Sequence, residues 1–295
     1  MTLSSNVRAG IASVGVAMTL VGLKGYASWE TGSAAMLGSL ADSALDLIAS
    51  LVTLYSVRLA ATPPDRQHRF GHGKAEAIAA FFQVVLISLS AFWIAVHAIG
   101  HLLTGARTAD AEAGIGVSLI AILLSLALVA YQRHVIARTG SLAISTDRIH
   151  YQSDLALNAV VIAALLLDQV ADIRGADAVG GIGIALWLLY GGYAASQKAV
   201  DQLMDREWPE ERRLAFIEVA NRHPELRGIH DLRTRTAGSH DFVQFHVWVD
   251  PHLTVGEAHR IMDEVEARLS DAFPGVEILI HPDPADDGDA LETRL

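Results

Sequence analysis

The stretches GSLADSALDLIAS (38–50) and STDRIHYQSDLALN (145–158) decide how this 295-residue chain is interpreted. Each lies in a segment apolar enough to form a helix in lipid, and each carries a pair of ionisable side chains four residues apart. The pairs are Asp42 with Asp46, and His150 with Asp154. Residues at i and i+4 project from one face of a helix. Because an ionisable group inside a membrane helix costs free energy, its default interpretation is functional.

The segments around these pairs predict a polytopic α-helical membrane protein. A membrane helix needs roughly 20 mostly apolar residues. Six segments meet this requirement: 9–28, 34–59, 77–103, 113–135, 142–167 and 178–199. Lysine and arginine are concentrated in the connections after the second and fourth segments. The six segments predict six transmembrane helices, and the positive-inside rule predicts that both termini are cytoplasmic.

Charge and hydropathy change near residue 205. Residues 1–205 hold 12 basic and 14 acidic side chains, whereas residues 206–295 hold 10 basic and 19 acidic ones. The second part has apolar patterns in the order α-β-β-α-β, which predicts a small two-layer α+β domain. We therefore expect a six-helix transmembrane domain at 1–205, a cytoplasmic α+β domain at 206–285, and an acidic disordered tail at 286–295. Acidic charge argues against nucleic acid as a partner, and the absence of cysteine excludes disulfides and thiolate metal sites.

The two intramembrane pairs predict a site for a divalent cation. Facing each other, the two helices would supply three carboxylates and one imidazole, which suit tetrahedral Zn²⁺. The alternative is that these groups cap helix ends or line a water-filled cavity, but two matched pairs on separate spans favour the metal site. Because metal ligands must lose their protons, metal and protons should compete. Either His150 carries the exchanged proton, as its ordinary titration range suggests, or an aspartate carries it and His150 sets the geometry.

Two further groups of possible metal ligands lie outside the spans. The loop DRQHRFGHGKAE (65–76) contains Asp65, His68 and His72, for which metal binding and simple solvation are about equally well supported. The soluble part contains His230, His246, His259, His281 and Asp283. Strand alternation turns His246 and His281 away from the core. From the residues alone, an exposed sheet face is slightly favoured over a metal site there.

These motifs together resemble the cation diffusion facilitator family, in particular its bacterial zinc/proton antiporters. The resemblance rests on ADSALD, HYQSD and DRQHRFGHGKAE in the membrane part, and on HDLRTR, QFH and HPDP in the soluble part. It implies a transport site made by both intramembrane pairs, zinc sites at both other clusters, and homodimers with a ferredoxin or metallochaperone-like cytoplasmic domain. It also implies an ion pair at the hinge between Lys74 and Asp205.

We therefore expect an efflux transporter that exchanges Zn²⁺, and also Cd²⁺, for protons by alternating access. The cytoplasmic zinc sites would be structural or regulatory, and no organic cofactor is expected. Two rival functions are a membrane metallohydrolase and a metal sensor that does not transport. The chain has no H-E-x-x-H motif and no spare carboxylate for a general base, so we do not expect an enzyme.

Overall fold

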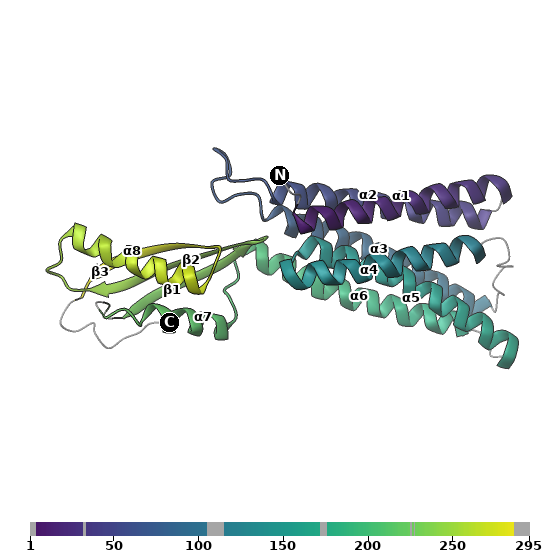
Figure 1. Cartoon of the computed structure of the whole chain (residues 1–295). Coiled ribbons are helices and arrows are strands. Elements are labelled where there is room, and N and C mark those ends of the chain that lie inside the picture. Colours follow the sequence, from purple (N-terminus) through teal and green to yellow (C-terminus); the bar gives the residue numbers. More distant parts are fainter. Residues whose placement is uncertain are drawn as a thin grey trace. The chain divides into compact units, whose positions relative to one another are not determined.

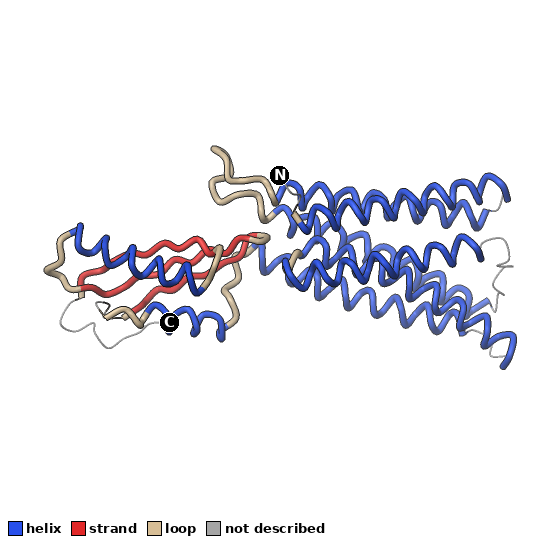
Figure 2. Tube along the Cα trace, in the orientation of Figure 1, coloured by secondary structure: helices blue, strands red, loops and turns tan. Residues whose placement is uncertain are grey.

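The computed structural model describes residues 4–31, 34–104, 115–171, 176–224, 226 and 228–285 (Figure 1). The chain divides into two compact units, Met1–Val200 and Asp201–Leu295. The first unit is all helix, and the second combines helices with a sheet (Figure 2). The tail expected to be disordered, 286–295, lies outside the described residues.

The first unit consists of six long helices. They are α1 (Ser5–Thr31), α2 (Ala34–Ala60), α3 (Ala75–Thr104), α4 (Ile115–Thr139), α5 (Leu142–Ala171) and α6 (Ala176–Leu203). Within the described residues, α1, α2, α3, α4 and α6 each contain a stretch long and apolar enough to cross a membrane. The sixth, α5, carries His150 and Asp154. These helices confirm the predicted polytopic architecture.

The helices extend beyond the apolar segments at several ends. In α1, the polar residues Asn6 and Arg8 belong to the first turns, although hydropathy alone predicts a start at Ala9. A polar first turn can continue a helix into the interface, where hydropathy no longer detects it.

Helices α1 and α2 are in close contact through a glycine. A β-carbon at Gly10 would lie 3.1 Å from the Cα atom of Leu54 on α2. Small residues permit such close approach of helix backbones in membranes. The same part of the unit contains a small apolar core with Val7, Val57 and Ile144, so α1, α2 and α5 pack together there.

The second unit is a two-layer α+β domain. Its elements are α7 (Glu210–Ala220), β1 (Ile229–Ala237), β2 (His240–Val249), α8 (Val255–Ala272) and β3 (Val276–Pro284). The sheet order is β1-β2-β3, with β1 antiparallel and β3 parallel to β2. This confirms the α-β-β-α-β order predicted from the apolar patterns.

One face of this sheet makes the hydrophobic core. Alternate residues of β2, including Val243, Phe245 and Val247, are buried with Phe216 of α7 and Ile261 of α8. Both helices therefore pack on the same face. The intervening residues of β2, His246 among them, project from the other face, as period-two alternation requires.

Candidate metal sites

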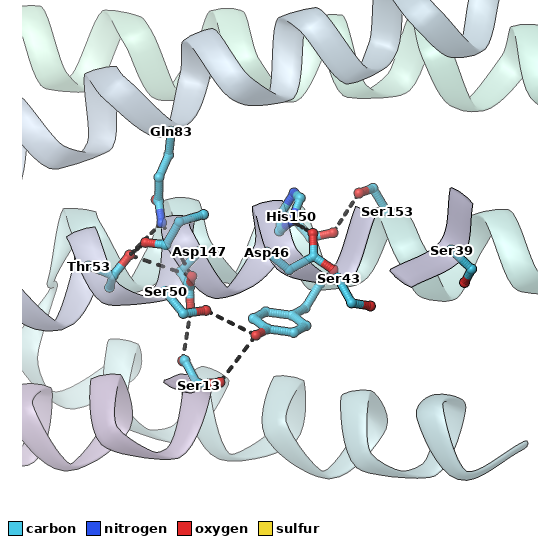
Figure 3. Close-up of polar contacts among 12 residues, drawn as sticks. Ser13, Ser39, Ser43, Asp46, Ser50, Thr53, Gln83, Asp147, His150 and Ser153 are labelled. Atoms are coloured by element: carbon cyan, nitrogen blue, oxygen red, sulfur yellow. Dashed lines mark hydrogen bonds and ion pairs between the residues drawn. The ribbon is translucent and has the colours of Figure 1, made fainter. Parts of the chain in front are cut away.

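Three of the four intramembrane ligand candidates lie together. Ligand atoms of Asp46, His150 and Asp154 all lie within 4.8 Å of one another. The imidazole Nε2 of His150 is 2.6 Å from Oδ1 of Asp46, which joins α2 to α5 (Figure 3). Both side chains are largely buried. The i,i+4 spacing on α5 places His150 and Asp154 on one face, and α2 supplies the opposing carboxylate.

Asp42 lies one turn before Asp46 on α2, and its side chain is exposed. It is not among the three residues whose ligand atoms converge. One helical turn is about 5.4 Å along the axis, a distance that a change of side-chain rotamer can reduce. The place of Asp42 in a four-ligand site therefore stays a prediction.

A lysine accompanies these acids within the helical unit. Lys24 of α1 donates to Oγ of Ser43 at 2.7 Å and to the carbonyl oxygen of Ser39 at 3.3 Å, both on α2. Its charge also interacts with Asp42 and Asp154. Sequence reasoning missed this residue, although Lys24 is the one lysine or arginine within the predicted first span, 9–28. A single ionisable group in a span was the available signal.

Sequence reasoning also missed a fully buried carboxylate, Asp147, one turn before His150 on α5. It accepts a hydrogen bond from Ser13 Oγ of α1 at 2.7 Å (Figure 3). It accepts another from Gln132 Nε2 of α4 at 2.7 Å. The available signal was a row of small polar residues on one face of α2, spaced three or four residues apart around Asp46. The row consists of Ser43, Asp46, Ser50, Thr53 and Ser56, all of which are buried.

The loop cluster between α2 and α3 comes together as a compact turn. Oδ2 of Asp65 is 3.3 Å from Nε2 of His72, and the rings of His68 and His72 are 4.6 Å apart at their centroids. Gly71 has φ +77°, a left-handed conformation that favours glycine and brings His72 back towards Asp65. The backbone N–H groups of His68 and Gln67 donate to Asp65 and hold the pKa of its carboxyl below the usual range. The three residues therefore offer a carboxylate and two imidazoles at one place.

The soluble unit carries a row of histidines across its sheet. His230 of β1 is paired with His246 of β2, which is paired in turn with His281 of β3. Asp283 lies two residues after His281. Its Oδ2 is 2.8 Å from Nδ1 of His246 and 3.1 Å from Nε2 of His230. The register of the three strands thus brings together side chains that are far apart in the sequence; His230 and Asp283 are 53 residues apart.

The electrostatics of this row favour an ionised carboxylate. Partial burial raises the pKa of Asp283, but the hydrogen bond from His246 and the charges of His246 and His281 outweigh burial, so the pKa lies below its ordinary value. His281 Nε2 is 3.3 Å from Asp283 Oδ1. His259 lies on α8, is exposed, and pairs with Asp263 at 3.7 Å. It is not part of the converging group of His230, His246 and Asp283.

The predicted hinge pair concerns residues of two different units. Asp205 has φ +55° and pairs with Arg235 of β1 at 3.6 Å within the second unit. Lys74 belongs to the first unit. A Lys74–Asp205 ion pair therefore stays a prediction.

Comparison with known proteins shows which family this chain belongs to. Residues 10–204 match the family profile described as cation efflux transmembrane domain, and residues 208–285 match the one described as cation efflux protein, cytoplasmic domain. The chain belongs to the cation diffusion facilitator family. It is accordingly a membrane-spanning cation efflux transporter.

Relatives of this transporter match it over most of its length. The cation-efflux pump FieF of Pectobacterium atrosepticum is 41% identical over 276 residues, covering 94% of this chain and 92% of the relative. FieF of Yersinia pestis is 40% identical, with the same coverage. Among solved structures, a CzrB chain is 38% identical. The match covers 27% of the transporter and 99% of the CzrB chain, with a TM-score of 0.25. A copper form of the MamM CTD is 28% identical. The match covers 29% of the transporter and 82% of the MamM chain, with a TM-score of 0.27.

Proposed function

We propose that the transporter exports Zn²⁺, and also Cd²⁺, across the inner membrane in exchange for protons. The observation that carries this proposal is the convergence of Asp46, His150 and Asp154 between α2 and α5. Two carboxylates and an imidazole suit a borderline-soft divalent ion. A site made only of carboxylates would instead favour harder cations such as Mn²⁺. Asp42 would be the fourth ligand after its side chain turns towards the group.

The hydrogen bond between Nε2 of His150 and Oδ1 of Asp46 supports proton exchange. At 2.6 Å, a proton lies between two atoms that are both prospective metal ligands. A metal ion needs the lone pairs that this proton occupies, so binding must release the proton. The reverse step, in which a proton returns to the pair, would favour release of the metal. The proton can belong formally to either residue, and the exchange follows in both cases.

The other parts of the chain would support this cycle. We assign transport to residues 1–205 and metal sensing and dimerisation to residues 206–285. Alternating access would move the helices that carry the site relative to the rest of the bundle. The basic loops would be cytoplasmic, which places both termini and the soluble unit inside the cell. Zinc at the loop cluster and at the histidine row, where His259 could contribute from a second copy, would report the cytosolic metal load.

The rival functions differ from export in what they require. A metallohydrolase needs an open coordination position and a general base beside the metal. A sensor needs metal binding but no flux. Neither rival accounts for a proton shared between two prospective ligands in the middle of membrane helices.

Metal-dependent proton flux in proteoliposomes tests the proposal. We expect Asp46→Ala to abolish Zn²⁺ transport and the accompanying proton flux. Only His150 and Asp154 of the converging group would remain, and these two ligands cannot hold the ion. Asp201→Ala is the matched control, since Asp201 lies on α6 and pairs with Arg206 outside the site. Zn²⁺ transport by the wild type without any proton movement would disprove antiport. Full transport by Asp46→Ala would disprove the site.

A further inference from the structure

Asp147 is a buried carboxylate that the proposed metal site does not use. It lies on α5 about 4.5 Å along the helix axis from His150, and its exposed fraction is 0%. Four side chains from four other helices donate hydrogen bonds to it. They are Ser13 Oγ of α1 at 2.7 Å, Gln132 Nε2 of α4 at 2.7 Å, Gln83 Nε2 of α3 at 3.2 Å and Thr53 Oγ1 of α2 at 3.5 Å. All four donors are neutral groups.

In Gln83 and Gln132, the amide nitrogen makes hydrogen bonds but the amide oxygen makes none within the described part of the chain. Gln83 Nε2 donates to Thr53 and Asp147, and Gln132 Nε2 donates to Ser13 and Asp147. Their Oε1 atoms are buried and have no hydrogen-bond partner among the described residues. Buried acceptors are normally paired. Two acceptors left unpaired beside one carboxylate therefore call for a function.

A proton on Asp147 would give these amides a partner. A carboxylate only accepts hydrogen bonds, whereas a carboxylic acid has an O–H group that needs an acceptor. An amide group that rotates by half a turn presents its oxygen in place of its nitrogen. The surroundings can therefore accommodate either protonation state of Asp147. When Asp147 is ionised, both amide N–H groups donate to it; when it is protonated, one rotated amide accepts its O–H through the amide oxygen.

We propose that Asp147, enclosed by Ser13, Thr53, Gln83 and Gln132, is a proton-binding site of the transporter that is separate from the metal ligands. The inference rests on the proton-coupled export proposed above. One oxygen of Asp147 binds one proton from the aqueous phase, an O–H bond forms, and the charge of the group changes from −1 to 0. No electrons are transferred, and the same proton leaves when the carboxylate is restored.

Polar groups connect Asp147 with the metal site. Ser50 lies one turn from Asp46 on α2, and its Oγ is 3.0 Å from the hydroxyl of Tyr151. That hydroxyl also donates to the carbonyl oxygen of Ser13 at 3.2 Å, and Ser13 in turn donates to Asp147 (Figure 3). The link through Ser13 joins its backbone carbonyl oxygen on one side to its hydroxyl on the other, so these contacts fix the positions of the polar groups between Asp147 and the metal site and are not a continuous proton path.

The charges around Asp147 couple its proton to the metal. The ionisable groups next to Asp147 are His150, Tyr151 and Arg148, all on α5. Helices α1, α2, α3 and α4 face it with neutral side chains, which are those of Ser13, Thr53, Gln83 and Gln132. An ionised Asp147 one turn from His150 favours a cation in the metal site, and protonation removes that attraction. By linkage, a metal ion in the site favours loss of the Asp147 proton.

Asp147→Asn tests the inference because asparagine keeps the shape and stays neutral. In proteoliposomes loaded with a pH-sensitive dye, we expect Zn²⁺ transport to persist at a reduced rate. The number of protons moved per Zn²⁺ should fall by about one. Glu76→Gln is the matched control, because Glu76 is another buried carboxylate of the same unit, hydrogen-bonded to Asn6 and Ser141. We expect the control to keep the wild-type ratio.

An infrared measurement on the full chain in detergent covers the case in which Asp147→Asn does not fold or transport. Wild-type protein and Glu76→Gln should show a carboxylic-acid C=O band that disappears when Zn²⁺ is added. Asp147→Glu should shift this band. A wild-type band that the Asp147 variants leave unchanged would overturn the inference, and so would an unchanged proton ratio in Asp147→Asn or an equal loss in Glu76→Gln. Absence of proton flux in the wild type would instead refute antiport, and the infrared band would still decide whether Asp147 binds a proton.

Discussion

At the scale of single residues, the intramembrane site is defined by charge as much as by ligand atoms. Lys24 donates to Ser43, which lies between Asp42 and Asp46 on α2. Its ammonium offsets part of the negative charge of the acids when no metal is bound. The same ammonium opposes the arrival of a divalent cation. Lys24 therefore lowers the affinity of the site and makes release easier, which suits a site that must empty in every cycle.

Lys24→Met should increase metal affinity. Removing a positive charge near the acids lowers the electrostatic cost of cation binding. At an effective dielectric constant of about 20, a unit charge about 10 Å from a divalent ion is worth about 3 kcal/mol, so the dissociation constant for Zn²⁺ should fall on the order of a hundredfold. Isothermal titration of the full chain in detergent measures this change. Lys198→Met, on the exposed side of α6, is the control, and weaker binding by Lys24→Met would contradict the expectation.

At the scale of elements, the sequence predicts what repeats along one helix or strand. The pairs in α2 and α5 could be found because i,i+4 spacing needs no knowledge of other helices. The pattern of β2 placed His246 on the face opposite Phe245 for the same reason. The hydrogen bonds of Asp147 could not be predicted, because they depend on how five helices are rotated against one another. The pairing of His230 with His246 and His281 likewise depends on strand register, which local alternation does not determine.

The start of α8 offers a test of local structure. Thr254 caps this helix, and its hydroxyl and backbone N–H hydrogen-bond with Glu257 in a capping box. Thr254→Ala should destabilise the helix by about 1 kcal/mol, which faster hydrogen exchange in its first turn would report. Thr254→Ser retains the hydroxyl and should exchange like the wild type.

The effect of Thr254→Ala should depend on pH in a defined direction. The hydrogen bonds from Thr254 lower the pKa of Glu257. A lowered pKa in the folded state contributes stability that is present above the unfolded pKa and is lost as pH falls through the folded pKa. The difference in exchange between Thr254→Ala and the wild type should therefore shrink on acidification. A difference that grows on acidification would contradict this origin of the cap.

At the scale of the whole molecule, a membrane unit with two candidate sites, one between its helices and one in the loop between α2 and α3, is joined to a soluble unit with a third. Export needs only the first. If the histidine row of the second unit binds metal as proposed, it would let the transporter respond to cytosolic metal before that metal is transported. Such a response requires that metal binding in one unit alters the activity of the other, which is a coupling free energy between two sites.

His246→Ala should reveal this coupling. The substitution removes the central histidine of the row, so activation of transport by cytosolic Zn²⁺ should require a higher concentration, while transport at saturating Zn²⁺ should persist. Initial rates measured against the Zn²⁺ concentration on the cytosolic side check this. His252→Ala is the control, since His252 lies in an exposed turn outside the row. An activation curve unchanged from the wild type would rule out regulation through the row.

The glycine contact between α1 and α2 has an electrical consequence. Because Gly10 lies directly against the backbone of Leu54, we expect the two helices to move as one body, so Lys24 would travel with Asp46 in the proposed transport cycle. Each elementary charge displaced across the full membrane costs or yields about 2.3 kcal/mol per 100 mV. A body that carries acids together with an ammonium has a smaller net charge than the acids alone. Under the proposed proton exchange, the return of the empty site should therefore depend less on membrane voltage and more on the proton concentration difference.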